Sequence, residues 1–418
     1  MGRKDNDCET WRGGDVPETN FHSDTKSGSV KQRTQQPAVG TYDSSDDASL
    51  RLESVLLCTD DDGSNGFQDV EACDDDEDGH LDYHIGLRMK ERYEVVSTLG
   101  EGAFGRVVEC IDRDTDELVA VKIVRNFESF SKVARSEIAV LEEIKSLDDD
   151  NRFACVRMLD WFEYKGHICI VFELLGLSTF EFLRRNNFHP FSVEQIRRMA
   201  YQIFRAVCFL HRNKLTHTDL KPENILLVCS DCDLEINQEI YEQRKPRSLD
   251  VKVADFGTAT FDHEHHESLV STRYYRAPEI ILDLGWNQSC DVWSLGCVLT
   301  EFYQGRTLFP SHNCKEHLAM MEKVLGPIPP HLLKKTRKRH YVLNGHLDWD
   351  EQSCSADYVR KNCQPLKNMQ SESEAERQLF DLLSCMLEYD VCRRITLEEA
   401  LWHPFFSPLR AEKEQQHS

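Results

Sequence analysis

The stretch HTDLKPEN at residues 217–224, followed by DFG at residues 255–257, decides the fold and the chemistry expected of this chain. It offers a carboxylate to accept a hydroxyl proton, a lysine to reach a terminal phosphate, and oxygen ligands of the kind that Mg²⁺ prefers. Asp219 is predicted to be the catalytic base and Lys221 the phosphate contact. The predicted metal ligands are Asn224 and Asp255. Such a set is typical of phosphoryl transfer, in which positioning and charge neutralisation do most of the catalysis.

A Gly-rich segment, GEGAFGRV, lies between two stretches that alternate apolar and polar residues, YEVVSTL before it and RVVECIDR after it. A GxGxxG pattern alone also fits dinucleotide-binding folds, in which the glycines lead from a strand into a helix. Here strands are predicted on both sides, so the glycines should form a hairpin turn whose backbone approaches phosphates closely. The predicted nucleotide contacts of this turn are Leu99, Gly100, Glu101, Gly102, Ala103, Phe104, Gly105, Arg106 and Val107.

A lysine ends the strand-like segment VAVK at residues 119–122 and provides a second positive charge for the phosphates. Such a lysine contacts the α- and β-phosphates when a glutamate from the next helix holds it. The following segment, SKVARSEIAVLEEIKSL, carries apolar residues at helical spacing, and Glu137 lies within it. Lys122 and Glu137 are therefore predicted to pair, whereas Glu142 and Glu143 are assigned to the exposed face of the helix.

The same arrangement of strands also predicts which residues surround the adenine of a bound nucleotide. Apolar side chains above and below the base are expected from the Gly-rich hairpin, the lysine strand and the strand after HTDLKPEN. The strand HICIVFELL should supply the back wall and backbone hydrogen bonds. The predicted set is Leu99, Val107, Ala120, Leu226 and Phe172, together with the backbone of Glu173 to Leu175.

The order of these motifs predicts an α+β protein with two lobes. Residues 93–175 are rich in predicted strands and residues 176–406 in helical periodicity, so a β-rich N-lobe should precede a helical C-lobe. Residues 1–90 are rich in Asp, Ser, Gly, Thr and Gln and are predicted to be a disordered acidic region. Residues 407–418 are predicted to form a short polar tail.

The segment that begins at DFG is closed by APE at residues 277–279. Glu279 is predicted to pair with Arg394 in the later segment CRRITLEEAL. The stretch DVWSLG at residues 291–296 is predicted to be a helix that anchors the HTDLKPEN loop. Both features are structural rather than catalytic.

Together these motifs resemble those of the eukaryotic protein kinases, and more narrowly the LAMMER (CDC-like) dual-specificity kinases of the cyclin-dependent and mitogen-activated branch. The signature EHLAMMER appears as EHLAMMEK at residues 316–323, with Lys323 in place of the last arginine. HTDLKPEN, FDHEHH after DFG, LDWDE and EALWHPFF fit the same family, and the resemblance covers about residues 80–410. It implies a bilobal protein kinase fold, ATP and Mg²⁺ as cofactors, and phosphate transfer to Ser and Thr, with autophosphorylation on Tyr.

The resemblance also implies Arg/Ser-rich splicing factors as substrates, and hence a role in regulating pre-mRNA splicing. A net charge of −23 gives independent support, because an acidic protein attracts basic peptides and repels nucleic acids and anionic membranes. We expect a monomer, in the nucleus or also in the cytoplasm, that binds neither nucleic acid nor membrane directly. Residues 1–90 lack the Arg-Ser dipeptides of animal members of the family, which leaves the role of this region open.

Cysteine usage agrees with an intracellular protein. The 16 cysteines are scattered, many of them in apolar stretches, and no secretory signal precedes them. This distribution favours free thiols in a reducing compartment over a disulfide framework.

Two departures from common kinases carry hypotheses. Thr218 replaces the arginine that many kinases use to hold a phosphorylated activation segment, which leads to the hypothesis that this chain needs no such phosphorylation. The stretch LEINQEIYEQRKPRSLDVKV, between HTDLKPEN and DFG, is longer than most kinases need and looks like an inserted hairpin, as LAMMER kinases have.

Weaker signals leave alternatives open. Cys229 with Cys232, and the histidines of FDHEHH, have spacings that a metal could use, but an exposed loop and the activation segment account for them better. The basic run KKTRKR at residues 334–339 is either an import or docking signal or an exposed helix face. Tyr274 and Tyr275 are either autophosphorylation sites or, in the favoured interpretation, part of the substrate pocket.

The main competing hypothesis is a scaffold, a kinase fold that recruits splicing factors without catalysis. Such proteins typically lose the strand lysine or one of the two aspartates, and Lys122, Asp219 and Asp255 are all present. A nucleotide-dependent metabolic enzyme would leave APE and the signature segment unexplained. An active phosphotransferase is therefore the favoured prediction.

Overall fold

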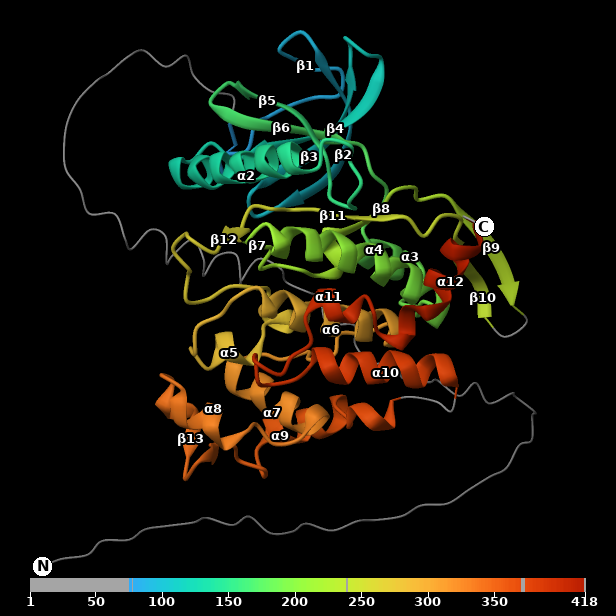
Figure 1. The fold of residues 1–418 in the computed structure, drawn as a ribbon. Coiled ribbons are helices and arrows are strands. Elements are labelled where there is room, and N and C mark those ends of the chain that lie inside the picture. The colour runs from blue at the N-terminus through green and yellow to red at the C-terminus, as the bar shows by residue number, and fades with distance from the viewer. Residues whose placement is uncertain (1–74, 77, 238–239, 370–372, 417–418) are drawn as a thin grey trace, which may run out of the picture. The chain divides into compact units, whose positions relative to one another are not determined.

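The computed structural model describes residues 75–76, 78–237, 240–369 and 373–416. Over these ranges a β-rich lobe is followed by a helical lobe (Figure 1). The predicted α+β bilobal fold is therefore confirmed. Within the same ranges, no helix combines the length and the apolar character needed to cross a membrane.

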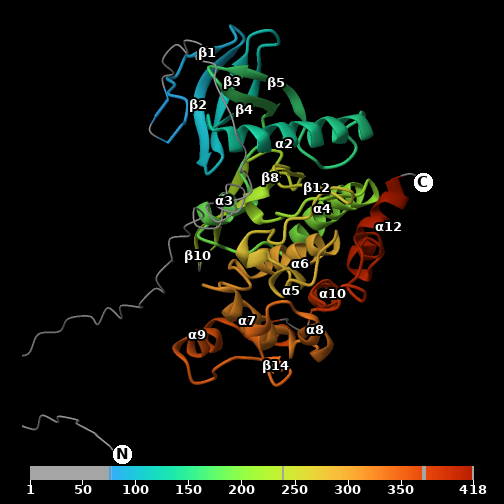
Figure 2. The same ribbon diagram turned by 90° about the vertical axis from the view of Figure 1, so that its left-hand side faces the viewer.

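The N-lobe is an antiparallel sheet of six strands in the order β1-β2-β3-β4-β6-β5. Its strands are β1 (Arg88–Met89), β2 (Tyr93–Gly102), β3 (Gly105–Asp112), β4 (Glu117–Val124), β5 (Met158–Tyr164) and β6 (His167–Glu173). One helix, α2 (Glu128–Leu147), packs against β4, β5 and β6 on the side nearer the C-lobe (Figures 1 and 2). Most of its apolar residues are buried, and Glu142 and Glu143 are exposed as predicted. This arrangement turns one face of α2 toward the site.

The C-lobe is built around α6 (Ser289–Gln304), which is buried from Cys290 to Phe302. The long helix α4 (Val193–Arg212) packs on it and begins with a capping box between Ser192 and Gln195. The other helices are α3 (Thr179–Arg185), α5 (Pro278–Ile281), α7 (Cys314–Leu325), α8 (Pro330–Lys335), α9 (Cys354–Asn362), α10 (Glu374–Met386), α11 (Leu397–Ala400) and α12 (Ser407–Gln416). Single 3₁₀ turns lie at Pro222–Asn224, Arg273–Tyr275, Arg339–Tyr341, Leu366–Asn368 and Pro404–Phe406.

Short two-stranded ribbons place the predicted motifs beside one another. They pair β7 (Leu215–Thr216) with β12 (Thr260–Phe261), β8 (Ile225–Leu227) with β11 (Val251–Val253), β9 (Cys232–Asn237) with β10 (Ile240–Pro246), and β13 (Val342–Leu343) with β14 (His346–Leu347). The first two ribbons flank HTDLKPEN and DFG and so bring these motifs together. The expected inserted hairpin is present as β9 and β10, whereas the end of its predicted stretch forms β11.

The predicted boundary of the disordered region is wrong. The described residues between 75 and 90 belong to the folded N-lobe, where Leu81 and Met89 are buried and β1 extends the sheet. Ion pairs and hydrogen bonds with the N-lobe hold this acidic segment, and composition cannot reveal such partners. The remainder of the predicted disordered region, residues 1–74, lies outside the described residues. At the other end, the polar tail forms α12 and buries Leu409.

Candidate active site

Lys122 in β4 reaches the carboxylate of Glu137 in α2. Its Nζ donates hydrogen bonds to both carboxylate oxygens of Glu137, at 2.8 and 3.0 Å, and lies 3.4 Å from Asp255 Oδ1. Burial alone would lower the pKa of Lys122, but the charges of Glu137 and Asp255 outweigh it and raise that pKa. Lys122 is therefore a fixed positive charge held between the sheet, α2 and the DFG segment.

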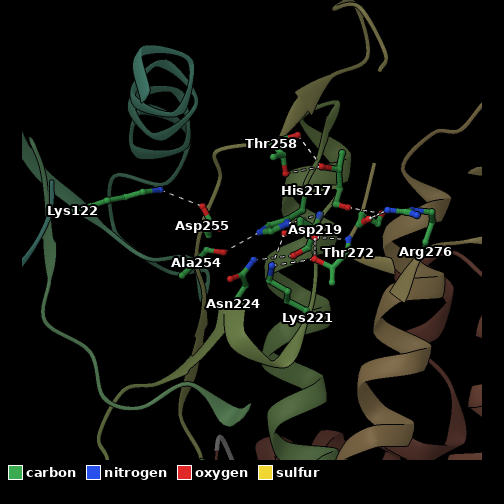
Figure 3. A network of polar contacts seen from close by, with 12 residues as sticks. Lys122, His217, Asp219, Lys221, Asn224, Ala254, Asp255, Thr258, Thr272 and Arg276 are labelled. Atoms are coloured by element: carbon green, nitrogen blue, oxygen red, sulfur yellow. Dashed lines mark hydrogen bonds and ion pairs between the residues drawn. The ribbon is translucent and has the colours of Figure 1, made fainter. Parts of the chain in front are cut away.

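Asp219 and Lys221 share one polar cluster with the activation segment (Figure 3). Asp219 Oδ1 accepts hydrogen bonds from the backbone N (2.7 Å) and the hydroxyl (2.8 Å) of Thr272. Its Oδ2 accepts one from Lys221 Nζ at 2.9 Å, and the same Nζ lies 3.1 Å from Thr272 Oγ1. A carboxylate, an ammonium group and a hydroxyl thus meet at one point, and transfer to a hydroxyl acceptor requires a carboxylate and a cation placed together in this way.

Thr272 is a site residue whose role the sequence argument did not assign. Its hydroxyl and backbone hold Asp219, and it also contacts Lys221. The signal available in the sequence was its position just before APE, in the segment that runs between DFG and APE. That position alone does not show that the segment folds back onto Asp219.

A buried aspartate of α6 fixes the backbone of the HTDLKPEN loop. Asp291 accepts hydrogen bonds from the backbone N of His217 and of Thr218, both at 2.9 Å, and His211 Nε2 lies 2.9 Å from its Oδ2. Thr218 has a φ of +69°, which is uncommon for a β-branched residue. The bonds from Asp291 hold this strained backbone in place. The anchoring role predicted for DVWSLG is therefore carried by Asp291.

Thr218 joins three segments through neutral hydrogen bonds. Its hydroxyl donates to the backbone oxygen of Thr258 at 2.8 Å and lies 2.9 Å from the Thr258 hydroxyl. Ser271 Oγ donates to the backbone oxygen of Thr218 at 2.6 Å. His217 Nε2 lies 3.1 Å from the backbone oxygen of Ala254, next to DFG (Figure 3). The catalytic loop, the DFG segment and the activation segment are thus connected without a phosphate group.

Asn224 and Asp255 offer oxygen ligands near this cluster. Asn224 Nδ2 donates to the backbone oxygen of Asp219 at 2.9 Å, which leaves its carbonyl oxygen as the potential ligand. Burial would raise the pKa of Asp255, but the charges of Lys122 and Lys221 outweigh it and lower that pKa, so the carboxylate is ionised. Two hard oxygen donors fit a divalent cation that takes its remaining ligands from phosphates and water.

The Gly-rich turn joins β2 to β3. Gly105 has a φ of +154°, and a Cβ there would lie 2.0 Å from the backbone oxygen of Ile123 in β4, so strand packing itself requires this glycine. The side chains of Glu101 and Arg106 bind each other at 3.0 Å, and Arg106 also contacts Asp76. Glu101 and Arg106, both predicted nucleotide contacts, therefore direct their side chains to each other and toward the N-terminal segment. Only their backbone groups are left to contact phosphates.

The predicted adenine-binding residues lie on neighbouring strands. In the sheet, Ala120 is opposite Phe172, and Val107 is opposite Lys122. These side chains are buried or half-buried, as are Leu175 and Leu226, whereas Leu99 is 48% exposed at the rim. The Glu173 carboxylate accepts hydrogen bonds from Lys252 Nζ (2.6 Å) and from the backbone N of Arg157 (2.8 Å). Because the side chain of Glu173 is engaged in these contacts, its main chain is the group that could form a hydrogen bond with the adenine.

The activation segment is held by residues of the chain itself. Arg276 is buried and donates to two backbone oxygens of this segment, at 2.9 and 2.7 Å. Tyr275 is buried too, and its hydroxyl donates to Glu301 in α6 at 2.8 Å, which favours its structural role over autophosphorylation. Trp286 Nε1 donates to the backbone oxygen of Glu267 at 2.7 Å. The predicted pair of Glu279 and Arg394 also forms, with both side chains buried.

The Cys and His spacings that a metal could use do not form groups of three or more potential ligands among the described residues. Across the described ranges, no three His, Cys, Asp or Glu side chains lie close enough together to hold an ion. This includes Cys229 with Cys232 and the histidines of FDHEHH. The basic run at residues 334–339 is exposed except for Thr336, whose hydroxyl bonds to the backbone oxygen of Leu282. Only Lys334 and Lys335 of the run lie in an α-helix, at the end of α8, so the helix-face alternative does not account for the run as a whole. The import or docking alternative stays a prediction.

Comparisons with known proteins agree with this geometry. Residues 93–406 match the family model described as protein kinase domain. The chain is 58% identical over 346 residues to the human "Dual specificity protein kinase CLK2", covering 82% of this chain and 69% of that protein. It is 54% identical over 342 residues to "Serine/threonine-protein kinase Doa" of Drosophila melanogaster, covering 80% and 41%. The crystal structure of the PF14_0431 kinase domain superposes with a TM-score of 0.74 at 37% identity, covering 79% of this chain and 100% of that one.

Proposed function

Because this chain belongs to the protein kinase family, and within it to the LAMMER (CDC-like) kinases, we propose that it is a dual-specificity kinase for Arg/Ser-rich proteins. The observation that carries the catalytic part is the position of Asp219, whose carboxylate faces both Lys221 and the hydroxyl-bearing Thr272. Its acceptors are Ser and Thr, with Tyr modified in autophosphorylation. The names of the relatives support the dual specificity.

Each residue of the site has a defined task in the proposed reaction. Lys122, held by Glu137, binds the α- and β-phosphates of ATP, and Lys221 neutralises charge on the transferred phosphate. Asp219 orients the acceptor hydroxyl and takes up its proton. Asn224 and Asp255 would hold Mg²⁺, which would supply positive charge to neutralise the phosphates. The Gly-rich turn covers the phosphates with its backbone.

The substrate class rests on charge. The chain carries 73 acidic against 50 basic residues, so Arg-rich peptides are attracted to it and nucleic acids are repelled. We therefore propose splicing factors with Arg/Ser repeats as substrates, and regulation of pre-mRNA splicing in the nucleus as the setting. We propose that the enzyme acts there as a monomer, and that it is also present in the cytoplasm.

A kinase assay on two peptides tests this proposal. An Arg/Ser-repeat peptide is compared with a peptide in which every arginine is replaced by glutamine, and the ratio of kcat/KM is measured at low and at high salt. We expect the basic peptide to be preferred by at least about tenfold at low salt and by less at high salt, because salt screens exposed charges. Equal rates on the two peptides would refute the basic-substrate proposal.

The Asp219→Asn variant tests the mechanism in the same assay. Asparagine keeps the size and hydrogen-bonding oxygen but cannot take up the proton, so kcat should fall about 10²–10⁴-fold while ATP still binds. A variant with undiminished kcat would contradict the role of Asp219. Wild-type protein that binds ATP but phosphorylates neither peptide would favour the scaffold hypothesis.

The activation segment motivates a further part of the proposal, activity without prior phosphorylation. Thr218 replaces the arginine that would bind a phosphate group, and Arg276 and Trp286 hold the segment instead. Protein treated with phosphatase should keep at least about half of its kcat on the basic peptide, because these hydrogen bonds remain. Near-complete loss of activity after the treatment would show that a phosphate group is required.

A further inference from the structure

An acidic segment ahead of the N-lobe sheet packs against the Gly-rich hairpin. It consists of Asp75, Asp76 and residues 78–81, and is called the N-terminal brace below. The brace closes on itself, because Asp75 pairs with Leu81 in a β-bridge and Asp76 Oδ1 accepts hydrogen bonds from the backbone N of residues 78 (3.1 Å) and 80 (2.8 Å). These contacts hold the two ends of the brace together.

Arg106, which follows the Gly-rich turn in β3, connects this turn to the brace. Its Nη2 lies 3.1 Å from Asp76 Oδ2, and its Nη1 donates to the backbone oxygen of Leu81 at 3.3 Å. Its Nε donates to Glu101 Oε2, at 3.0 Å, on the other strand of the hairpin. His80 of the brace is buried and lies 3.8 Å from the same carboxylate. One guanidinium thus contacts the brace on one side and the hairpin on the other.

Arg125 makes a second connection, to the tip of the turn. Its Nε donates to the backbone oxygen of Asp78 at 2.7 Å, and its Nη1 donates to the backbone oxygen of Ala103 at 3.3 Å. The guanidinium lies over the rings of Phe127 and Phe130, at 5.5 and 5.4 Å from their centroids. An aromatic platform therefore restrains the cation that joins the brace to the tip.

The brace is itself anchored to the rigid part of the N-lobe. Asp75 Oδ1 lies 2.9 Å from Nε2 of the fully buried His167, and its Oδ2 accepts a hydrogen bond from Asn126 Nδ2 at 3.0 Å. The backbone N of Asn126 donates to the oxygen of Gly79, which has a φ of +73°. A Cβ at Gly79 would lie 2.6 Å from the ring of Phe127. The turn fits closely against the edge of the sheet.

We propose that the N-terminal brace is a positioning element for ATP: through Arg106 and Arg125 it holds the Gly-rich turn in the conformation that covers the phosphates. A hairpin turn exposed to solvent has low local stability, so ordering it on nucleotide binding costs conformational entropy. Contacts that hold the turn before the nucleotide binds reduce this cost. The brace contacts the turn from outside, so it acts without touching the nucleotide. The proposal rests on the proposed function only in taking ATP as the phosphate donor.

Nucleotide binding to the full chain tests the brace directly. Asp76→Asn keeps the Oδ1 acceptor that closes the brace but removes the charge facing Arg106, and Arg125→Met keeps apolar packing on the two rings but removes both hydrogen bonds. In the double variant, Kd and KM for ATP should rise about 3- to 10-fold, with kcat and the peptide KM nearly unchanged. Binding of adenosine, which has no phosphates, should stay within about twofold of wild type.

Asp82→Asn is the matched control, because Asp82 is an exposed acid just after the brace that makes none of these contacts. It should bind ATP like the wild type. The proposal fails if the double variant binds ATP normally, if adenosine binding weakens equally, or if Asp82→Asn has the same effect. The proposal is also refuted if the melting temperature falls, kcat falls and the KM values for ATP and for the peptide both rise in parallel. The brace would then only stabilise the fold. Because binding is measured without catalysis, an inactive wild type would refute the proposed function alone.

Discussion

At the scale of single residues, Thr218 stands where many kinases have an arginine, and its hydroxyl forms a hydrogen bond within the chain. It ties the catalytic loop to Thr258, just after DFG, with a 2.8 Å hydrogen bond, and the backbone oxygen of Thr218 accepts from Ser271. The sequence shows the missing arginine but not the partner of the threonine. The hydrogen bond is short-range and neutral, so its strength should depend little on salt.

Replacing Thr218 with valine removes this hydroxyl and keeps the β-branched shape, so backbone strain at the positive φ is unchanged. We expect kcat to fall about 3- to 10-fold, as for a lost hydrogen bond of about 1 kcal/mol, with little change in KM for ATP. Thr216→Val is the control, since the buried Thr216 hydroxyl has no hydrogen-bond partner within the described part of the chain. Equal losses of kcat in the two variants would contradict this role of Thr218.

At the scale of elements, the signature segment EHLAMMEK forms most of α7 and is largely buried. His317 is fully buried against Phe309, and within the described residues neither of its ring nitrogens has a hydrogen-bond partner. Burial and the charges of Arg276 and Arg273 lower the pKa of His317 to about 3. The signature helix is therefore part of the core behind the activation segment, and its histidine is neutral.

This histidine predicts a pH-dependent stability difference. Because the folded-state pKa lies below the unfolded value of about 6.5, its contribution is fully present above pH 6.5 and is lost as the pH falls toward 3. When the pH is lowered from 7 to 5, the wild type should lose about 2 kcal/mol of unfolding free energy through this histidine, and His317→Met should not. The stability of the variant relative to wild type should therefore rise by about 2 kcal/mol. Thermal and urea unfolding at both pH values measure this gain. The exposed His340→Met serves as control, and an identical pH response of the two variants would rule out the explanation.

At the scale of the whole molecule, one buried ion pair connects the activation segment to the end of the C-lobe. Arg394 donates to both carboxylate oxygens of Glu279, at 2.7 and 2.8 Å, and lies 5.1 Å from the ring of Trp293 in α6. The Arg394 and Glu279 side chains are 0% and 3% exposed. Loss of one partner leaves the other charge buried without compensation, and this penalty exceeds the net value of the intact pair.

Arg394→Met should therefore lower the free energy of unfolding by about 3–5 kcal/mol. Adding Glu279→Gln should restore part of the loss, because the uncompensated charge is removed. Arg212→Met is the control: Arg212 also pairs with a residue far along the chain, Glu398, but both side chains are more than half exposed, so the cost should stay below about 1 kcal/mol. Equal costs for the two arginines, measured by thermal and urea unfolding, would contradict the argument.

The sequence by itself determined the fold class, the two lobes and the identity of most groups in the site. Periodicity marks the strands and α2, α4 and α10, and the motifs VAVK, HTDLKPEN and DFG point to Lys122, Asp219 and Asp255. These features are readable because they depend on residue types at short, regular intervals. The pairing of Lys122 with Glu137 also followed, since the next helix offered one glutamate on its inward face.

The tertiary structure decided which residues meet across long stretches of chain. The contacts of Asp219 with Thr272, of Thr218 with Thr258, and of the N-terminal brace with the Gly-rich turn join segments from different parts of the sequence. The folding of the described residues between 75 and 90 was also decided by tertiary contacts, because an acidic segment looks disordered until its arginine and histidine partners are brought beside it. Composition reports what a segment could bury by itself, and folding supplies the partners.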